Sequence, residues 1–164
     1  MTRTLVLRNR QRTRALNTPL LRRILLHLLQ EEFAANDYEL GFHFIAADEM
    51  ARVNQQFLQH DGSTDVITFD YGDIGAALKL HGEVFVSIPD AVAQAQEFST
   101  TWQSELVRYI IHGLLHLRGF DDLQPAKRRE MKREENRLLK QVVAQFPVRS
   151  LARVRRPSSV IRHS

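Results

Sequence analysis

The sequence contains no cysteine. Disulfides and thiolate metal ligands are therefore excluded, and any metal ion must be held by histidine, aspartate or glutamate. Long apolar stretches are missing as well. The N-terminal residues hold no segment typical of a signal peptide, and no stretch approaches the length of a membrane span. We therefore expect a cytoplasmic protein that has no membrane partner.

Internal repeats and a second domain are also absent from the 164 residues. The hydrophobic content of 43% and the charged content of 26% are ordinary for a folded globular chain. A chain of this length can bury about two thirds of its unfolded surface in one domain. We expect one domain over residues 1–146. Residues 147–164 contain no acidic residue and are expected to form a basic, flexible tail.

Positive charge is concentrated at the two ends of the chain. The formal net charge is +4, which is compatible with a polyanionic partner such as a nucleic acid. Non-specific affinity for RNA comes largely from neutralising its phosphates. The arginines that crowd the ends are Arg3, Arg8, Arg10, Arg12, Arg14, Arg149, Arg153, Arg155, Arg156 and Arg162.

One apolar segment carries two histidines. His112 and His116 lie four residues apart, so a helix places their imidazoles on one face, roughly one turn apart. Gly119 can end that helix and let the chain return Asp121 or Asp122 to the two rings. Two imidazoles and a carboxylate make a three-ligand metal site with a position left for water. The alternative is a pair of satisfied core histidines. We favour the metal because it would serve both buried rings at once.

The same segment resembles a known family. From residue 112 to residue 122 it reads His-Gly-Leu-Leu-His-Leu-Arg-Gly-Phe-Asp-Asp. This is similar to the signature His-Gly-x-Leu-His-Leu-x-Gly-Tyr-Asp-His of the YbeY family, the bacterial metal-dependent endoribonucleases of rRNA maturation. Three further segments resemble the family in the same order: Val53-Asn54, residues 64–69 and residues 82–87. The resemblance covers most of residues 1–145.

The resemblance assigns roles to several residues. It implies that His112, His116 and Asp122 bind the metal ion, with Asp122 in place of the family's third histidine. Asp121 is the alternative third ligand; otherwise we expect it to accept a hydrogen bond from a ligand imidazole or to serve as a turn residue. Asp65 matches the family pattern and is a candidate catalytic residue. Its alternative role is a cap at the start of a strand.

Zinc is the expected metal, with one ion per chain, because Zn²⁺ accepts two nitrogens and one oxygen in a tetrahedral site. The carboxylate ligand also suits Mn²⁺ or another divalent ion. Leu58 occupies the position of a family arginine that is thought to steady the phosphate, and leucine cannot imitate a guanidinium. Arg108 and Arg118 are the candidates for RNA binding, with Arg52 and Lys79 as further substitutes in space.

The order of the elements predicts an α+β fold. It is a single domain with a small mixed β-sheet, helices packed on the sheet, and a zincin-like helix that carries the metal ligands. The expected strands are residues 4–7, 39–47, 64–69 and 82–87, the last two forming a hairpin. The expected helices are one from residue 19, residues 48–57, residues 89–98, the histidine helix and one from residue 125.

The helix ends and one charged face can also be predicted. Thr18 and Asp48 are the expected caps of the first two helices, and residues 100–103 have the form of a capping box ahead of the histidine helix. The charged residues of the last helix, Glu135 among them, are expected on its solvated face.

The residues support functions of different classes. The leading hypothesis is an enzyme, a metal-dependent endoribonuclease (a hydrolase) specific for single-stranded RNA. By the resemblance it would act in rRNA maturation, at the 3′ end of the small-subunit rRNA, and in ribosome quality control. Its implied partners are single-stranded rRNA, the small ribosomal subunit, and a ribosomal protein or ribosome-associated GTPase. Metal-activated water or a 2′-hydroxyl would attack the phosphate.

Two alternatives remain. One is a ribosome-assembly factor whose metal is structural or only weakly catalytic. The other is a metallopeptidase, which is less favoured because Gly113 stands where the zincin helix has its glutamate base.

Overall fold

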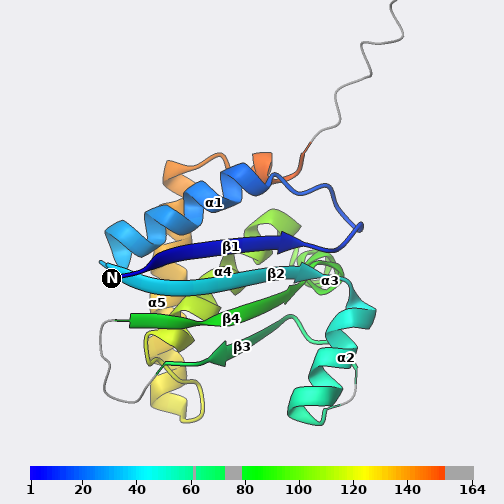
Figure 1. Ribbon diagram of the computed structural model, residues 1–164. Helices are drawn as coiled ribbons and strands as arrows, with labels where there is room; N and C mark the ends of the chain where they lie inside the picture. Colours follow the sequence, from blue (N-terminus) through cyan, green and yellow to red (C-terminus); the bar gives the residue numbers. More distant parts are fainter. Residues whose placement is uncertain (61, 73–78, 154–164) are drawn as a thin grey trace, which may run out of the picture.

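The computed structural model describes residues 1–60, 62–72 and 79–153 of the chain (Figure 1). Its centre is a four-stranded sheet in the order β1-β2-β4-β3. The first three of these strands are parallel to one another, and β3 runs antiparallel to β4. The predicted mixed sheet and the pairing of the last two strands are therefore confirmed. The strands are β1 (Arg3–Asn9), β2 (Asp37–Ile45), β3 (Val66–Asp70) and β4 (Lys79–Ser87).

Five α-helices accompany the sheet within the described residues. They are α1 (Thr18–His27), α2 (Ala47–Leu58), α3 (Ile88–Phe98), α4 (Trp102–Leu117) and α5 (Pro125–Gln145). A turn of π-helix (Leu28–Glu32) extends α1, and a 3-10 turn (Val148–Leu151) follows α5. The α+β class and the single domain are as predicted. None of the described helices has the length and apolar character needed to cross a bilayer.

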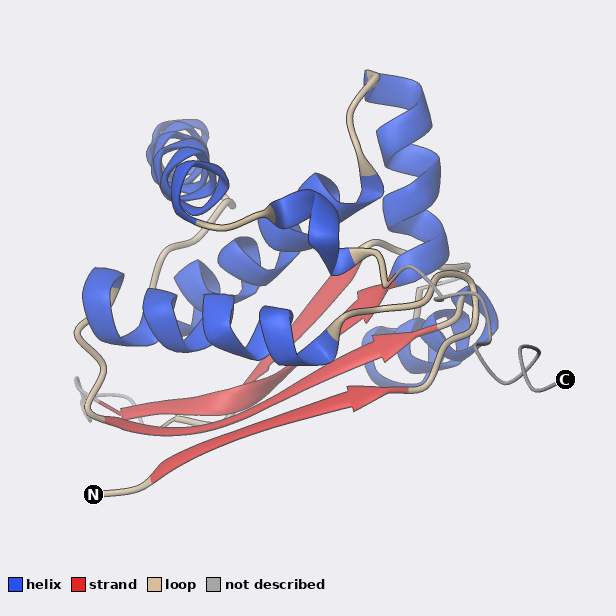
Figure 2. Ribbon diagram, turned by 90° about the horizontal axis from the view of Figure 1, so that it is seen from above, coloured by secondary structure: helices blue, strands red, loops and turns tan. Residues whose placement is uncertain are grey.

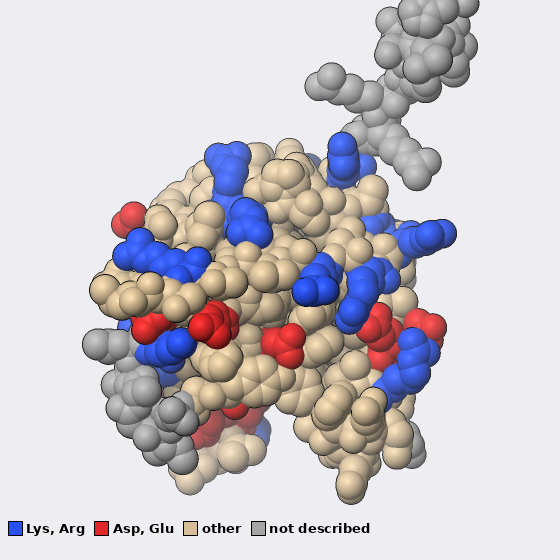
Figure 3. Space-filling model, viewed as in Figure 1, with Lys and Arg blue, Asp and Glu red and all other residues tan. Residues whose placement is uncertain are grey.

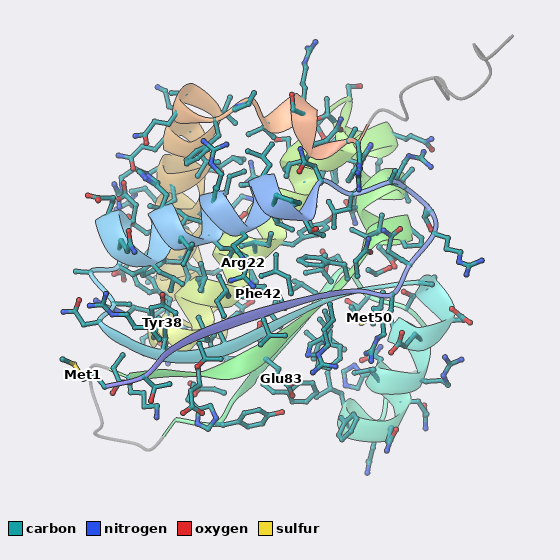
Figure 4. The ribbon with its side chains drawn as sticks, turned by 45° about the horizontal axis from the view of Figure 1, so that its top comes forward. Met1, Arg22, Tyr38, Phe42, Met50 and Glu83 are labelled. Carbon is teal, nitrogen blue, oxygen red and sulfur yellow. The ribbon has the colours of Figure 1, made fainter. Side chains whose placement is uncertain are left out.

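Most of the helices cover one face of the sheet (Figure 2). That face contributes alternate apolar residues of the strands, such as Phe42 and Val84, to the main core. Phe42 lies on this side, whereas Glu83 lies on the other (Figure 4). A smaller cluster forms where α2 packs on the sheet and brings Met50 and Val53 against Ile67. The helix-covered face is the one that positions the histidines.

Three helix starts differ from the prediction. Asn17, not Thr18, caps α1, because its side chain accepts a hydrogen bond from the Leu20 N–H. Asp48 lies inside the first turn of α2, where a carboxylate favours the positive end of the helix dipole without capping it. Thr101 caps α4 by accepting from the Ser104 N–H, one residue later than the predicted box. At α1 and α4 a neighbouring polar residue makes the capping hydrogen bond instead, whereas α2 begins after Ala46 without a side-chain cap.

The predicted tail begins with a packed turn. Val148 and Leu151 are buried in the main core, and Leu16 forms a β-bridge with Ala152. The expectation of flexibility from residue 147 is therefore wrong for these first residues, because two apolar side chains anchor them. Residues 154–164 lie outside the described part of the chain, and the domain boundary stays a prediction.

Candidate metal centre

Helix α4 lies unusually close to the sheet. A Cβ atom placed on Gly113 would come within 2.9 Å and 3.0 Å of the two methyl groups of Val84 and within 3.3 Å of Thr68 Oγ1. A side chain at this position would therefore push the helix away from β3 and β4. The glycine lets the backbone approach, and this approach places His112 and His116, on either side of it, next to β3.

The two predicted histidines meet through their Nε2 atoms. These nitrogens of His112 and His116 are 3.1 Å apart, and the ring centroids are 4.7 Å apart at an interplanar angle of 79°. Both side chains are about three-quarters buried, with 25% and 28% of their surface exposed. The spacing of four residues on one helix thus produces the predicted pair.

The end of α4 fixes the ring of His116. Gly119 has a φ of +105°, in the left-handed region that favours glycine. Its N–H donates to His116 O, and the Phe120 N–H donates to Leu115 O at 3.0 Å, which is the Schellman pattern of helix termination. The Phe120 carbonyl is thereby turned to His116 Nδ1, at 3.2 Å. A carbonyl oxygen only accepts, so His116 carries its proton on Nδ1 and presents a lone pair on Nε2.

A buried carboxylate of α5 fixes the ring of His112. Glu135 is 5% exposed, and its Oε2 lies 2.9 Å from His112 Nδ1. Its other oxygen accepts from Arg108 Nη1 at 2.7 Å and from Lys132 Nζ at 3.3 Å. Burial acts to raise the pKa of Glu135, but the hydrogen bonds from His112 and Arg108 prevail and lower it to about 2. The ionised carboxylate accepts a hydrogen bond from the Nδ1–H of His112, which leaves the Nε2 lone pair of that ring facing His116.

The prediction that Glu135 lies on the solvated face of α5 is wrong, because the side chain is buried. The residue falls four positions after Met131 and three before Leu138, and both of these face the core. The 3.6-residue period of the apolar stripe therefore passes through Glu135. This apolar period is the feature of the sequence from which the burial of Glu135 could be predicted.

The two aspartates that follow Gly119, Asp121 and Asp122, have different surroundings. Asp122 Oδ2 lies 3.9 Å from His116 Nε2. Ligand atoms of His112, His116 and Asp122 all lie within 4.8 Å of one another, a grouping that could hold a metal ion. Asp121 instead accepts from the Leu123 N–H at 3.2 Å and lies 3.4 Å from Lys127 Nζ. Of the two roles expected for Asp121 besides that of a ligand, its contacts fit the turn residue.

The electrostatics of the site favour a neutral His116 ring. Burial lowers the pKa of His116, and the neighbouring His112 lowers it further, while Asp122 acts in the opposite direction. Two neutral imidazoles with their lone pairs directed at each other repel unless a cation lies between them. The chemistry of the donor set therefore fits a divalent metal ion.

Two cavities meet at His112. One, of 450 Å³, runs between α3, α4 and α5, and Asp65, Asp122 and Arg108 line it. The other, of 260 Å³, lies along β3 and is also lined by His116. In the space-filling view the surface is notched between α2 and the region where α5 begins (Figure 3). The candidate centre is thus open to a ligand on both sides.

The remaining predicted residues separate into two groups. Asp65 caps the start of β3, since its Oδ1 accepts from the Val66 N–H at 2.8 Å, and it also lines the larger cavity. Arg108 lines that cavity too, as do Arg128 and Lys132, which were not singled out from the sequence. Arg118 points elsewhere: it donates to Phe33 O at 2.7 Å and lies over the Phe33 ring.

Leu58, which stands in place of the family arginine, and the basic residues that could substitute for that arginine have different surroundings. Leu58 is the last residue of α2 and is 44% exposed. Arg52 pairs with Asp48, and Lys79 pairs with Glu39. Of the basic substitutes named from the sequence, Arg108 is the one that lines the cavity of His112.

Comparisons with known proteins identify relatives of this chain. Residues 6–143 match the model of the family described as Endoribonuclease YbeY. The Endoribonuclease YbeY of Parabacteroides distasonis is 38% identical over 109 residues, which cover 66% of this chain and 75% of that protein. The Endoribonuclease YbeY of Salinibacter ruber is 34% identical over 137 residues, covering 80% of this chain and 87% of the relative.

The fold has a solved counterpart as well. The solution structure of TM1509 from Thermotoga maritima superposes with a TM-score of 0.66 at 24% identity, covering 93% of this chain and 100% of that one. At this identity the likeness concerns the fold alone. The family match covers part of β1, the other three strands, the histidine helix and nearly all of α5. The chain therefore belongs to the YbeY family of endoribonucleases.

Proposed function

We propose that this protein is a metal-dependent endoribonuclease that cuts single-stranded rRNA. It would act in the cytoplasm on the 3′ end of the small-subunit rRNA and in ribosome quality control. His112, His116 and Asp122 would hold one Zn²⁺, with Mn²⁺ as the alternative ion. The small ribosomal subunit and a ribosomal protein or ribosome-associated GTPase are its proposed partners.

The observation that carries the proposal is the 3.1 Å separation of the two Nε2 atoms. Phe120 O and Glu135 each accept a hydrogen bond from an Nδ1–H, so both facing Nε2 atoms are free to bind a cation. Hydrogen bonds of this kind orient imidazole ligands in metal sites and make them more basic. Bound there, a divalent ion would lower the pKa of a water molecule and polarise a phosphoryl oxygen.

The side chains around the cluster have separate roles in this proposal. Arg128 and Lys132 lie on the wall of the 450 Å³ cavity and would attract the RNA phosphates. Arg108 would contribute to the same field, although it is already bonded to Glu135. Asp65 lies on that wall as well, and as the candidate site carboxylate it would accept a hydrogen bond from the bound RNA.

A peptidase is disfavoured by the packing of α4. In zincins the residue after the first histidine is the glutamate base. Here that residue is Gly113, where even a Cβ would collide with Val84. A glutamate at this position would be directed at the sheet rather than at a substrate.

The test is cleavage of single-stranded rRNA by the metal-loaded chain and by His116→Ala, purified side by side, with the metal content of each measured. Cleavage and bound metal in the wild type alone would support the nuclease. Equal cleavage by both proteins would contradict it. Metal bound by the wild type without any cleavage would favour an assembly factor that does not cut RNA.

A further inference from the structure

We propose that the end of the 450 Å³ cavity away from the metal cluster is a pocket for one RNA base, and that it selects bases with an exocyclic amino group over uracil. Adenine, cytosine and guanine carry such a group. This inference rests on the proposed function, because it places the base beside the phosphate that the cluster would cut. It adds a preference that the metal ligands alone do not provide.

Tyr109 gives the first indication of a ligand. The residue is 5% exposed, it lines the cavity, and its buried hydroxyl has no hydrogen-bond partner among the described residues. Burial raises the pKa of this phenol, and the nearby carboxylates of Asp65 and Glu105 raise it further. Tyr109 therefore stays a neutral O–H that can donate or accept. A buried hydroxyl without a partner costs free energy, and a bound base would satisfy it.

Two carboxylates line the pocket with hydrogen-bond acceptors. Glu105 is 8% exposed and is held by a hydrogen bond from Thr100 Oγ1 at 2.8 Å. Asp65 is held by the Val66 N–H at 2.8 Å. Both line the cavity together with Tyr109. Ionised carboxylates only accept hydrogen bonds, so this wall favours a ligand edge that presents N–H groups.

A base with an exocyclic amino group fits this acceptor-lined wall better than uracil does. Adenine and cytosine each present an exocyclic NH₂ on the edge that pairs with another base, and guanine presents an NH₂ beside a ring N–H. Uracil presents one N–H between two carbonyl oxygens, which would be directed at the carboxylates. One hydrogen-bonded base contact of this kind commonly changes affinity by about tenfold or more.

The remaining lining suits the flat face of a base. Phe98 borders the cavity and is 62% exposed, so its ring is accessible to a ligand in the cavity. Aromatic side chains in RNA-binding proteins stack on bases with little regard to sequence. Gln94 adds an amide to the same wall. Stacking thus supplies affinity, while the polar groups supply selectivity.

The pocket and the cluster have a suitable spacing. Tyr109 precedes His112 by three residues and Glu105 precedes it by seven, so along α4 they lie about 4.5 Å and about 10 Å from it. These three residues line one continuous cavity. A base bound against Tyr109 and its own phosphate at His112 are therefore within the reach of one nucleotide.

The first experiment measures binding, and a gel run after each titration checks that the strands remain uncut. The metal-loaded full chain is titrated with 2′-O-methyl decamers of uridine and with the same strand carrying one central adenosine, cytidine or guanosine. We expect the three substituted strands to bind about tenfold more tightly than the uridine strand. Glu105→Gln should reduce this ratio to near one, because it replaces the acceptor-only carboxylate that disfavours uracil, and Tyr109→Phe, which removes a further acceptor, should lower the ratio as well. Tyr71→Phe is the matched control, because that hydroxyl bonds Glu83 on the other face of the sheet and should leave the ratio unchanged.

The second experiment maps cleavage in the unmodified strands. Cuts concentrated beside the inserted base, and lost from that position in Tyr109→Phe, would support the pocket. Equal affinity for all four strands, or an unaltered ratio in Glu105→Gln or Tyr109→Phe, would overturn it. If the strands bind selectively but none is cut, the pocket stands and the nuclease is refuted. Phe98→Ala should weaken all four strands similarly, by about tenfold.

Stability separates this role from a purely structural one. If the Tyr109 hydroxyl has no partner before RNA binds, its removal should leave the melting temperature of the free protein unchanged or higher. A clear fall in the melting temperature of Tyr109→Phe would mean that the hydroxyl supports the fold, and it would contradict the proposal.

Discussion

Glu135 and His112 are separated by 23 residues in the sequence and meet at 2.9 Å, with the carboxylate on α5 facing an imidazole of α4. This contact links the last helix to the candidate metal centre. Because Glu135 is ionised and nearly fully buried, it orients the ring and adds negative charge behind it. The affinity of the cluster for a cation should therefore depend on a residue that does not touch the cation.

Glu135→Gln tests this dependence. The amide keeps the volume but loses the charge, so we expect the affinity for Zn²⁺ to fall by about 10- to 100-fold. Competition with a chromophoric chelator measures the change. Glu134→Gln is the control, because that neighbouring side chain pairs with Arg137 on the helix surface. Equal zinc affinities in Glu135→Gln and the wild type would contradict the orienting role.

The contact also shows what the sequence could and could not predict. His112, His116 and Asp122 were predicted from a helical spacing, a glycine and a motif, all of which are local, and the fold brings the three together. The partner of His112 lies on another helix, and its identity depends on how α5 packs on α4. The apolar period through Met131 and Leu138 is compatible with a buried Glu135, which the charge run around it obscured, and it does not identify what Glu135 contacts.

Other differences have the same origin. Thr18, Asp48 and Thr100 are good capping residues by type, yet a neighbouring residue caps α1 and α4, and α2 has no side-chain cap. The sheet order also depends on long-range pairing, in which β2 lies between β1 and β4. Residue type and period predicted which elements form, whereas tertiary packing decides their exact ends and neighbours.

The two aspartates after Gly119 should behave differently. Asp122→Ala should reduce zinc affinity strongly, because it removes one of three ligand groups, whereas Asp121→Ala should change it little. Asp122→His, which restores the family pattern, should retain the metal. Zinc content after dialysis, measured by atomic absorption, checks all three variants. Loss of zinc from Asp121→Ala alone would show that the other aspartate is the ligand.

Acid stability should depend on Glu83, far from the metal centre. Burial acts to raise its pKa, but hydrogen bonds from Tyr71 and His43 prevail and lower it below the ordinary 4.5. The stabilisation is therefore complete above pH 4.5 and is lost as the pH falls through the lower pKa of the folded state. We expect a contribution of a few tenths of a kcal/mol, because 38% of the side chain is exposed.

Urea unfolding between pH 6 and pH 3 measures this contribution. The free energy of unfolding should fall less steeply with acid in Glu83→Gln than in the wild type, and Tyr71→Phe should lie between the two. Identical slopes in all three proteins would show that these hydrogen bonds do not favour the charged carboxylate.

The variant Gly113→Ala tests whether stability and zinc binding require the close approach of α4 to the sheet. In an ordinary helix Gly→Ala is stabilising, but here the added Cβ would meet the Val84 methyl groups at 2.9 Å and 3.0 Å. We expect Gly113→Ala to lower the free energy of unfolding of the metal-free protein by about 1–3 kcal/mol. It should also weaken zinc binding, because the histidines on either side would move with the helix.

The double variant Gly113→Ala with Val84→Ala separates collision from other causes. Val84→Ala alone should be destabilising, since it removes two buried methyl groups. In the pair, the alanine Cβ at position 113 occupies part of the vacated space, so the double variant should be more stable than the sum of the single changes by about 0.5–3 kcal/mol. Strict additivity in urea unfolding would mean that Val84 and the helix backbone are not in contact. In that case Gly113 would have to be explained by something other than the packing of α4 on β4.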